Sequence, residues 1–318
     1  MEQRIKLILY VLIIIYTHID ARPQSFYEYD SDTINISYVG KETTCDIREI
    51  KDTSIVKSFS ISKSEDLKYL SKIPQVEELY ISKCDLKDVD FSVLKTLKFL
   101  TFVNVKNMNN SILSTIKTNS LIVFEILKSE VESLEGITNN QLNLVKLFIS
   151  NSVIKNDIDV SRLSKLKIFV ISNARISSFP CLSFNKMLRT VIIGNCKIKH
   201  ITKIKFPKSL LNLYLTNFDF KHIDTLSLRL PDLRRVSLES CKLKDFPYFL
   251  SQNTNIIDIE LKFNNIKRVQ CGITNFVSLE ALTILGEKEI RLDSCAYLFL
   301  KERGLFIPNY VIEPEKPR

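Results

Sequence analysis

Leu188–Ile198 reads LRTVIIGNCKI and Leu211–Phe220 reads LNLYLTNFDF, and the same spacing of apolar residues recurs along most of the chain. The shared pattern is L-x-x-L-x-L-x-x-(N/C/S)-x-L, and ten copies of it begin 21 to 24 residues apart. A period in this range predicts one short supersecondary unit per copy, stacked on its neighbours as a solenoid. The copies begin at Val76, Leu97, Leu121, Leu144, Leu166, Leu188, Leu210, Leu233, Ile256 and Leu279.

Each copy alternates in the manner of a strand with one buried face. Positions 4 and 6, such as Leu147 and Ile149, are predicted to point inward, and position 5 between them outward. Ten such strands are expected to pair as one parallel sheet. The copy at Leu97 is ambiguous, because the pattern also fits from Leu100. A second apolar column, at position 14, is predicted to close the core: Val89, Leu134, Phe179, Ile201, Ile223, Phe246, Val269 and Leu292.

The two ends of the chain depart from this pattern. Residues 1–21 contain the apolar run LILYVLIIIY, which is too short to span a bilayer and predicts a signal peptide. No transmembrane anchor is expected downstream, so the predicted location is secreted and extracellular. The expected order is signal peptide (1–21), flexible leader (22–42), N-terminal cap repeat (43–71), solenoid (72–301) and C-terminal tail (302–318).

The repeated units LYISKCDL, from Leu79, and VSLESCKL, from Val236, resemble the leucine-rich-repeat superfamily, in a style similar to its extracellular arthropod members. The resemblance implies an α/β solenoid, a curved horseshoe with a parallel concave β-sheet and a mostly loop or 3-10 convex side. It also implies ligand binding on the concave strands. The chain has no nucleophile elbow, phosphate loop or H-E-x-x-H motif, so we expect a non-enzymatic protein without a cofactor.

The outward positions suggest where a ligand binds. Position 5 is apolar in four consecutive copies, at Phe148, Val170, Ile192 and Tyr214, with Ile168 beside them. A contiguous exposed apolar stripe predicts a protein-binding site, with Arg235 on its polar rim. The predicted function is a secreted interaction protein, either an immune recognition factor or a salivary or venom-type effector. The alternative is that these residues only reflect β-propensity.

Basic residues support a second hypothesis. The formal net charge is +9, and lysines recur at positions 10 and 12. A line of ammonium groups along one edge attracts sulfated glycan or another polyanion, although lysines are also ordinary on a solvated loop face. The residues of this candidate site are Lys197, Lys199, Lys221, Lys242, Lys244 and Lys267.

The cysteines are sorted by their place in the repeat. Three of the seven occupy the inward position 9 and are predicted to be free, buried thiols: Cys84, Cys196 and Cys241. Cys271 and Cys295 lie in consecutive copies at positions 16 and 17. Stacked copies are ~4.8 Å apart, which is within disulfide reach, so we predict a bridge between them. Cys45 and Cys181 have no evident partner.

Other polar residues allow alternatives. His200, His222 and Asp245 share position 13, which offers a remote zinc-hydrolase hypothesis against ordinary surface side chains. Asn35 and Asn109 begin N-x-S sequons and are candidate glycosylation sites. Four asparagines at position 8 either form a hydrogen-bonded ladder or hold their own turns: Asn151, Asn173, Asn195 and Asn217.

Overall fold

A computed structural model describes residues 26–27, 36–37, 47–49, 56–200, 204–219, 228–286 and 289–313. The chain divides into two compact units, Met1–Thr44 and Cys45–Arg318. In the first unit, β1 (Phe26–Tyr27) pairs antiparallel with β2 (Ile36–Ser37). The second unit contains the repeats.

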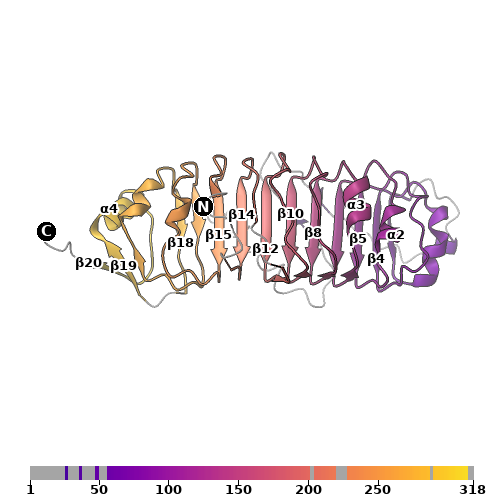
Figure 1. The fold of residues 1–318 in the computed structure, drawn as a ribbon, viewed down its shortest axis with the longest axis horizontal. Helices are drawn as coiled ribbons and strands as arrows, with labels where there is room; N and C mark the ends of the chain where they lie inside the picture. The colour runs from indigo at the N-terminus through magenta and orange to yellow at the C-terminus, as the bar shows by residue number, and fades with distance from the viewer. Residues whose placement is uncertain are drawn as a thin grey trace. The chain divides into compact units, whose positions relative to one another are not determined.

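The second unit is built on one eleven-stranded parallel sheet whose strands follow one another in chain order (Figure 1). Ten strands come from the ten copies of the repeat. The eleventh, β3, lies ahead of them and pairs with β4, with Phe59 opposite Leu79. The strands are β3 (Ser58–Ile61), β4 (Glu78–Ser82), β5 (Phe99–Val103), β6 (Val123–Leu127), β8 (Lys146–Ser150), β10 (Ile168–Ser172), β12 (Thr190–Gly194), β14 (Asn212–Thr216), β15 (Arg235–Glu239), β16 (Asp258–Glu260) and β18 (Ala281–Thr283).

The pairing register reproduces the period of the sequence. Leu79 lies opposite Leu100, which places Leu100 at position 4 and selects Leu97 as the start of the ambiguous copy. Positions 4 and 6 of the copies are buried in one continuous apolar core. Each strand therefore gives one face to the core and the other to the outside, as the alternation predicts.

Position 8 of every copy turns the chain away from the sheet. The backbone there is left-handed in all ten copies, with φ of 49° to 51° at Asn151, Asn173, Asn195 and Asn217. Asparagine tolerates this conformation better than most residues, which favours the turn interpretation. Asn217 also donates a hydrogen bond to Asn195 (3.0 Å). The other left-handed residues in this column are Lys83, Asn104, Lys128, Ser240, Phe263 and Gly286.

The cysteine side chains at position 9 point back under the ends of the strands, where their sulfur atoms contact backbone carbonyl oxygens. The Sγ of Cys84 contacts the carbonyl oxygen of Ser82 at 3.2 Å, and Cys241 contacts that of Glu239 at 3.3 Å. Cys84, Cys196 and Cys241 are free thiols, as predicted, but only Cys84 and Cys241 are buried, whereas Cys196 is partly buried. Burial raises the pKa of each to about 11, which disfavours the reactive thiolate form.

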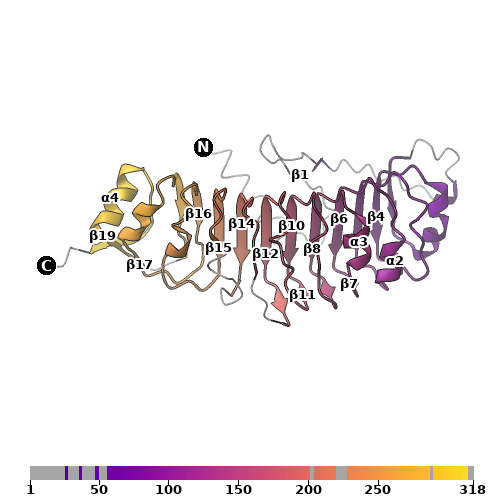
Figure 2. The ribbon, with the colours of Figure 1, turned by 45° about the horizontal axis from the view of Figure 1, so that its top comes forward.

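Short elements form the side opposite the main sheet. A four-stranded parallel sheet runs along one edge of the stack (Figure 2): β7 (Glu130–Val131), β9 (Val153–Ile154), β11 (Arg175–Ile176) and β13 (Lys197–Ile198). This small sheet was not expected from the sequence. The remaining segments are the 3-10 helices η1 (Ile47–Glu49), η2 (Ser64–Lys72), η5 (Tyr248–Leu250) and η6 (Cys271–Asn275) and the α-helices α2 (Asn110–Ser114) and α3 (Glu135–Asn140).

The helices α2 and α3 pack closely because of one glycine. A Cβ atom added at Gly136 would lie 2.6 Å from the backbone nitrogen of Ser114 and 2.9 Å from the carbonyl oxygen of Asn110. Backbone atoms cannot move aside as a side-chain end can. This contact therefore requires glycine at position 136.

A three-stranded sheet and a helix close the C-terminal end. The sheet contains β17 (Arg268–Val269), β19 (Ile290–Asp293) and β20 (Tyr310–Glu313), and α4 spans Ser294–Glu302. The segment 302–318, expected to be a tail, is thus partly ordered in a strand. Its Glu313 forms ion pairs with Arg268 (2.9 Å) and Arg291 (3.3 Å), which supply the register that apolar patterning does not predict.

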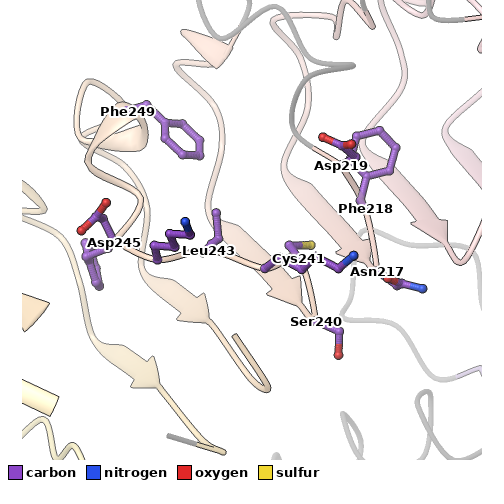
Figure 3. A pocket seen from close by; sticks show the side chains of 11 residues that line it. Asn217, Phe218, Asp219, Ser240, Cys241, Leu243, Asp245 and Phe249 are labelled. Carbon is purple, nitrogen blue, oxygen red and sulfur yellow. The ribbon is translucent and has the colours of Figure 1, made fainter. Parts of the chain in front are cut away.

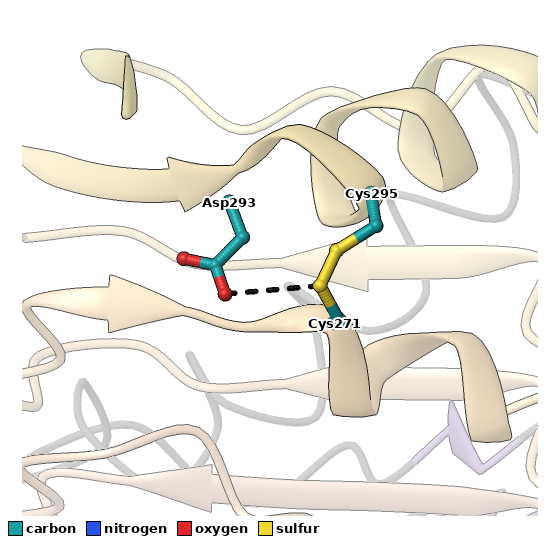
Figure 4. A group of neighbouring side chains, drawn as sticks. All are labelled: Cys271, Asp293 and Cys295. Atoms are coloured by element: carbon teal, nitrogen blue, oxygen red, sulfur yellow. Dashed lines mark hydrogen bonds between the residues drawn. A yellow bond between two sulfur atoms is a disulfide. The ribbon is translucent and has the colours of Figure 1, made fainter. Parts of the chain in front are cut away.

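A disulfide joins the last two repeats. Cys271 of η6 and Cys295 of α4 are bonded, with their Cα atoms 5.3 Å apart (Figure 4). Asp293 lies beside them, with one carboxylate oxygen 3.8 Å from the Cys271 sulfur. The bridge lies where stacking of positions 16 and 17 predicts it. These three side chains could otherwise resemble a metal site, but both sulfurs are taken up in the bridge.

Candidate functional site

The face of the main sheet that points away from the core, here called the outer face, carries positions 3, 5 and 7 of each copy. At position 5, Phe148 is aligned with Val170, Val170 with Ile192, and Ile192 with Tyr214. These four residues, the apolar row, come from β8, β10, β12 and β14. Parallel pairing without bulges places them side by side at ~4.8 Å per strand. The structure thus assembles the predicted stripe in one line.

The residues of the stripe differ in their exposure. Phe148, Ile168, Ile192 and Tyr214 are each partly buried. Val170 is only 4% exposed, so it is not the exposed contact residue that the sequence predicted. It lies between the larger side chains of Phe148 and Ile192, which flank it at one strand spacing on either side. The usable apolar surface therefore consists of the other four residues, and Arg235 is exposed on β15 nearby.

Glu125 adjoins the apolar row on its N-terminal side. It is aligned with Phe148, and the Nζ of Lys146 forms an ion pair with it at 2.7 Å. The ammonium group of Lys146 also lies 5.3 Å from the centre of the Phe148 ring, and Thr101 donates a hydrogen bond to Glu125 (3.3 Å). Lys146 is only 9% exposed. At this end of the row the charges of Glu125 and Lys146 offset each other, and both side chains have partners within the protein.

Three carboxylates lie on the C-terminal side of the row. Ser237 follows Tyr214 in register, and Glu260 follows Ser237. Asp258 is on the same strand as Glu260, and Glu239 is at the end of the neighbouring strand β15. Lys262 forms an ion pair with Glu260 at 3.5 Å. We call Glu239, Asp258 and Glu260 the acidic cluster.

The acidic cluster is partly desolvated. Glu239 is 9% exposed and Glu260 is 8% exposed. Burial, reinforced by the charge of Glu260, raises the pKa of Asp258 to about 6, against the lowering effect of Arg235 and Lys262. Burial is also the main cause of the raised pKa of Glu239. Both shifts indicate carboxylates that lack sufficient positive charge around them.

The predicted basic edge is divided between two places. Lys242 and Lys244 line a hollow of about 590 Å³ together with Asp219 and Asp245, which offset their charge (Figure 3). Lys197 and Lys199 lie in a separate groove of about 320 Å³, which is lined by three isoleucines and by Lys155 and Arg175. Lys267 is exposed on a later copy. Lys221 lies outside the described residues.

The remaining candidate residues fall in three groups. His200 is exposed, while His222 and the sequon residue Asn35 lie outside the described residues, so the zinc hypothesis gains no support. Asn109 caps α2, where its side chain accepts a hydrogen bond from the Ile112 backbone (3.0 Å). Cys181 is an exposed free thiol, and Cys45 lies outside the described residues.

Known structures share this architecture. No protein-family model matches the sequence, and none of the curated proteins matches it. An internalin from Listeria monocytogenes is similar over 80% of this chain and 74% of its own, with 14% identity and a TM-score of 0.56. A chain of the LRIM1/APL1C complex is similar over 78% of this chain and 55% of its own, with 14% identity and a TM-score of 0.51.

A third structure, the Drosophila Toll–Spätzle complex, is similar over 84% of this chain and 50% of the matching chain, with 12% identity and a TM-score of 0.46. The internalin and the LRIM1/APL1C chain share with this chain the long parallel sheet of the leucine-rich-repeat fold. This chain has the leucine-rich-repeat fold. At these identities the likeness extends to the fold alone. Among the described residues, no helix of this leucine-rich-repeat chain is long and apolar enough to cross a membrane.

The acidic cluster was not singled out from the sequence. Positions 3 and 7 share the face of position 5 by the same two-residue alternation. This alternation places Asp258, at position 3 of the same copy, and Glu239, at position 7 of the preceding copy, on the face of Glu260. The signal was therefore present in the sequence. The burial that makes these carboxylates unusual was not.

Proposed function

We propose that this chain is a non-enzymatic interaction protein whose outer sheet face binds a protein partner over the apolar row. The observation that supports this proposal most is the register, which aligns Phe148, Val170, Ile192 and Tyr214 on four consecutive strands, with Ile168 beside them. Aromatic and aliphatic side chains held on a rigid sheet are suited to a contact core. Charged residues at both ends of the row form its rim.

We further propose that the protein acts outside the cell, as an immune recognition factor or a secreted effector. The apolar N-terminal run is typical of a signal peptide. The Cys271–Cys295 disulfide is consistent with an oxidising compartment. Secretion is tested by expressing the full chain in eukaryotic cells and sequencing the N-terminus of the protein in the medium, where a start after Ala21 is expected. Retention of the uncleaved chain in the cytosol would contradict this role.

The binding surface is tested with two matched substitutions. Tyr214→Glu places a charge in the apolar row, and Tyr80→Glu makes the same change at the same repeat position on β4. Proteins cross-linked to the full chain in its native fluid are identified by mass spectrometry, and their affinity is measured for both variants. We expect a loss of more than about 10-fold for Tyr214→Glu alone. Equal binding by both variants would rule out the apolar row.

A second candidate function is polyanion binding in the groove of Lys197 and Lys199. It is favoured by the convergence of four basic side chains, including Arg175 and Lys155, around an apolar floor. Lys155 is already paired with Glu130 at 2.6 Å, which weakens this site. Heparin affinity that falls steeply with salt and is lost on Lys197→Glu/Lys199→Glu is the expected result. The matched variant is Lys242→Glu/Lys244→Glu, and equal effects of both would indicate unspecific attraction.

A further inference from the structure

The acidic cluster is continuous with the apolar row. Tyr214 is aligned with Ser237, and Ser237 with Glu260, so Glu260 lies two strands beyond the aromatic ring. Two strand spacings correspond to ~10 Å. Any molecule that covers Ile192 and Tyr214 and extends across the strands toward the C-terminal end reaches these carboxylates next.

The positive charge around the cluster is not paired with all of its carboxylates: Arg235 is aligned with Asp258 across the strands, and Lys262 acts on both Asp258 and Glu239, without an ion pair to either among the described residues. Glu260 has Lys262 at 3.5 Å. Within the described parts of the chain, Glu239 and Asp258 have no hydrogen-bond or ion-pair partner for their carboxylates. The Glu239 residue lies on the outer face of the sheet, but neighbouring residues cover it so that only 9% of it is exposed. Burial of most of this residue disfavours the charged carboxylate, which has no cation beside it to offset that cost.

We propose that the acidic cluster binds an arginine or lysine side chain of the protein partner that covers the apolar row. This inference rests on the proposed function and specifies the partner's chemistry: an apolar segment followed, ~10 Å away, by a cationic side chain. The cation completes the coordination of Glu239 and Asp258, which have no counter-charge within hydrogen-bonding distance. Arginine fits best, because its planar fork bonds two carboxylate groups at once.

Long-range attraction does not account for this preference. The chain has a formal net charge of +9, so a cationic partner is repelled by the protein as a whole. Selectivity for a basic residue must therefore come from contacts at the cluster itself. This separates the proposed site from the unspecific binding of cations to an acidic protein.

A random dodecapeptide display library, selected on the full chain, provides the probe. Each enriched peptide is synthesised twice, once with its arginine and once with citrulline, which keeps the shape and removes the charge. Affinities are measured for wild type, for Glu239→Gln/Asp258→Asn, and for the control Glu78→Gln, a carboxylate on the outer face of β4. Circular dichroism establishes that all three proteins are folded.

We expect citrulline to weaken binding to wild type and to Glu78→Gln by about 10-fold and to have little effect on the double variant. Peptides that require Tyr214 but contain no basic residue, or that tolerate citrulline, would overturn this inference and leave the proposed function intact. Peptides that bind Tyr214→Glu as well as wild type would contradict the proposed function. Failure to enrich any peptide would count against both.

Discussion

The two sides of the apolar row carry glutamates at the same repeat position, Glu125 and Glu260, in opposite electrostatic settings. Glu125 has the ammonium group of Lys146 at 2.7 Å and a hydrogen bond from Thr101. Glu260 has Lys262 at 3.5 Å but also shares its surroundings with Asp258 and Glu239. One residue type therefore has a structural role at one end and remains available for a partner at the other. The neighbours across the strands make this difference.

Removing the cation at the N-terminal end is expected to have the largest effect. Lys146→Met leaves Glu125 as a desolvated carboxylate without its ion-pair partner, so the free energy of unfolding should fall by about 2 kcal/mol. Urea denaturation measures the change. The double variant Glu125→Gln/Lys146→Met should recover part of the loss, because no uncompensated charge is left. A single variant as stable as wild type would show that the pair contributes little.

At the C-terminal end of the row, removing a charged group is expected to increase the free energy of unfolding rather than to lower it. The pKa of Asp258 is about 6 in the folded protein, above its ordinary value of 3.8. The folded state therefore binds this proton more tightly, and the contribution of Asp258 to wild-type stability should fall as pH rises between these values and stay level above 6. Asp258→Asn lacks this fall. From pH 3.5 to pH 7.5 its stability should gain about 1 kcal/mol relative to wild type, after allowance for partial exposure.

Thermal melting of both proteins across this pH range checks the prediction. Glu78→Gln, a carboxylate on the same face far along the sheet, is the control and should follow the wild-type curve. If Asp258→Asn also follows that curve, the cluster is better solvated or better paired than its burial indicates.

A smaller change is expected from Lys262, the lysine beside the acidic cluster. Lys262 lowers the pKa of both Asp258 and Glu239, so in Lys262→Met the pKa of Asp258 should lie further above its ordinary value than in wild type. NMR titration of labelled aspartate carboxyl groups measures the shift directly. An unchanged pKa of Asp258 would show that Lys262 is too well hydrated to act on it.

The smallest effect is expected where the same kind of pair is exposed. Glu77 contacts Lys98 at 2.6 Å and Lys57 at 3.2 Å, and hydrogen bonds from these two lysines lower its pKa. Both lysines are open to solvent, which screens such pairs. Glu77→Gln should melt within error of wild type. A loss of stability comparable to that of Lys146→Met would mean that the distance between the charges, rather than their desolvation, determines how much an ion pair stabilises this protein.

Much of the fold was predictable because each copy obeys the same local rule. The alternation around Leu147 and Ile149 predicts a strand, and the period places that strand beside its equivalents in the next copies. The Cys271–Cys295 bridge and the free thiol of Cys241 follow from the same register. The exceptions have no periodic signal, such as β20, which is held by ion pairs of Glu313 with two arginines.

The candidate site was predictable only in outline. The sequence places Phe148, Ile192 and Tyr214 on one face, but it does not indicate that Val170 between them is covered. It also treats the lysines of positions 10 and 12 as one line, whereas the structure separates the groove of Lys197 from the hollow of Lys242. These outcomes depend on the sizes and charges of neighbours on other strands.

The sequence by itself determines the repeat, the direction in which each strand residue points, and which residues become neighbours across the stack. A period of 21 to 24 residues and a two-residue alternation suffice for this, because both are local properties of the chain. Tertiary structure alone decides how much water each side chain retains and which charge meets which. Desolvation and Coulomb energy depend on distances between groups from different copies, and for that reason Glu125 is satisfied while Glu239 is not.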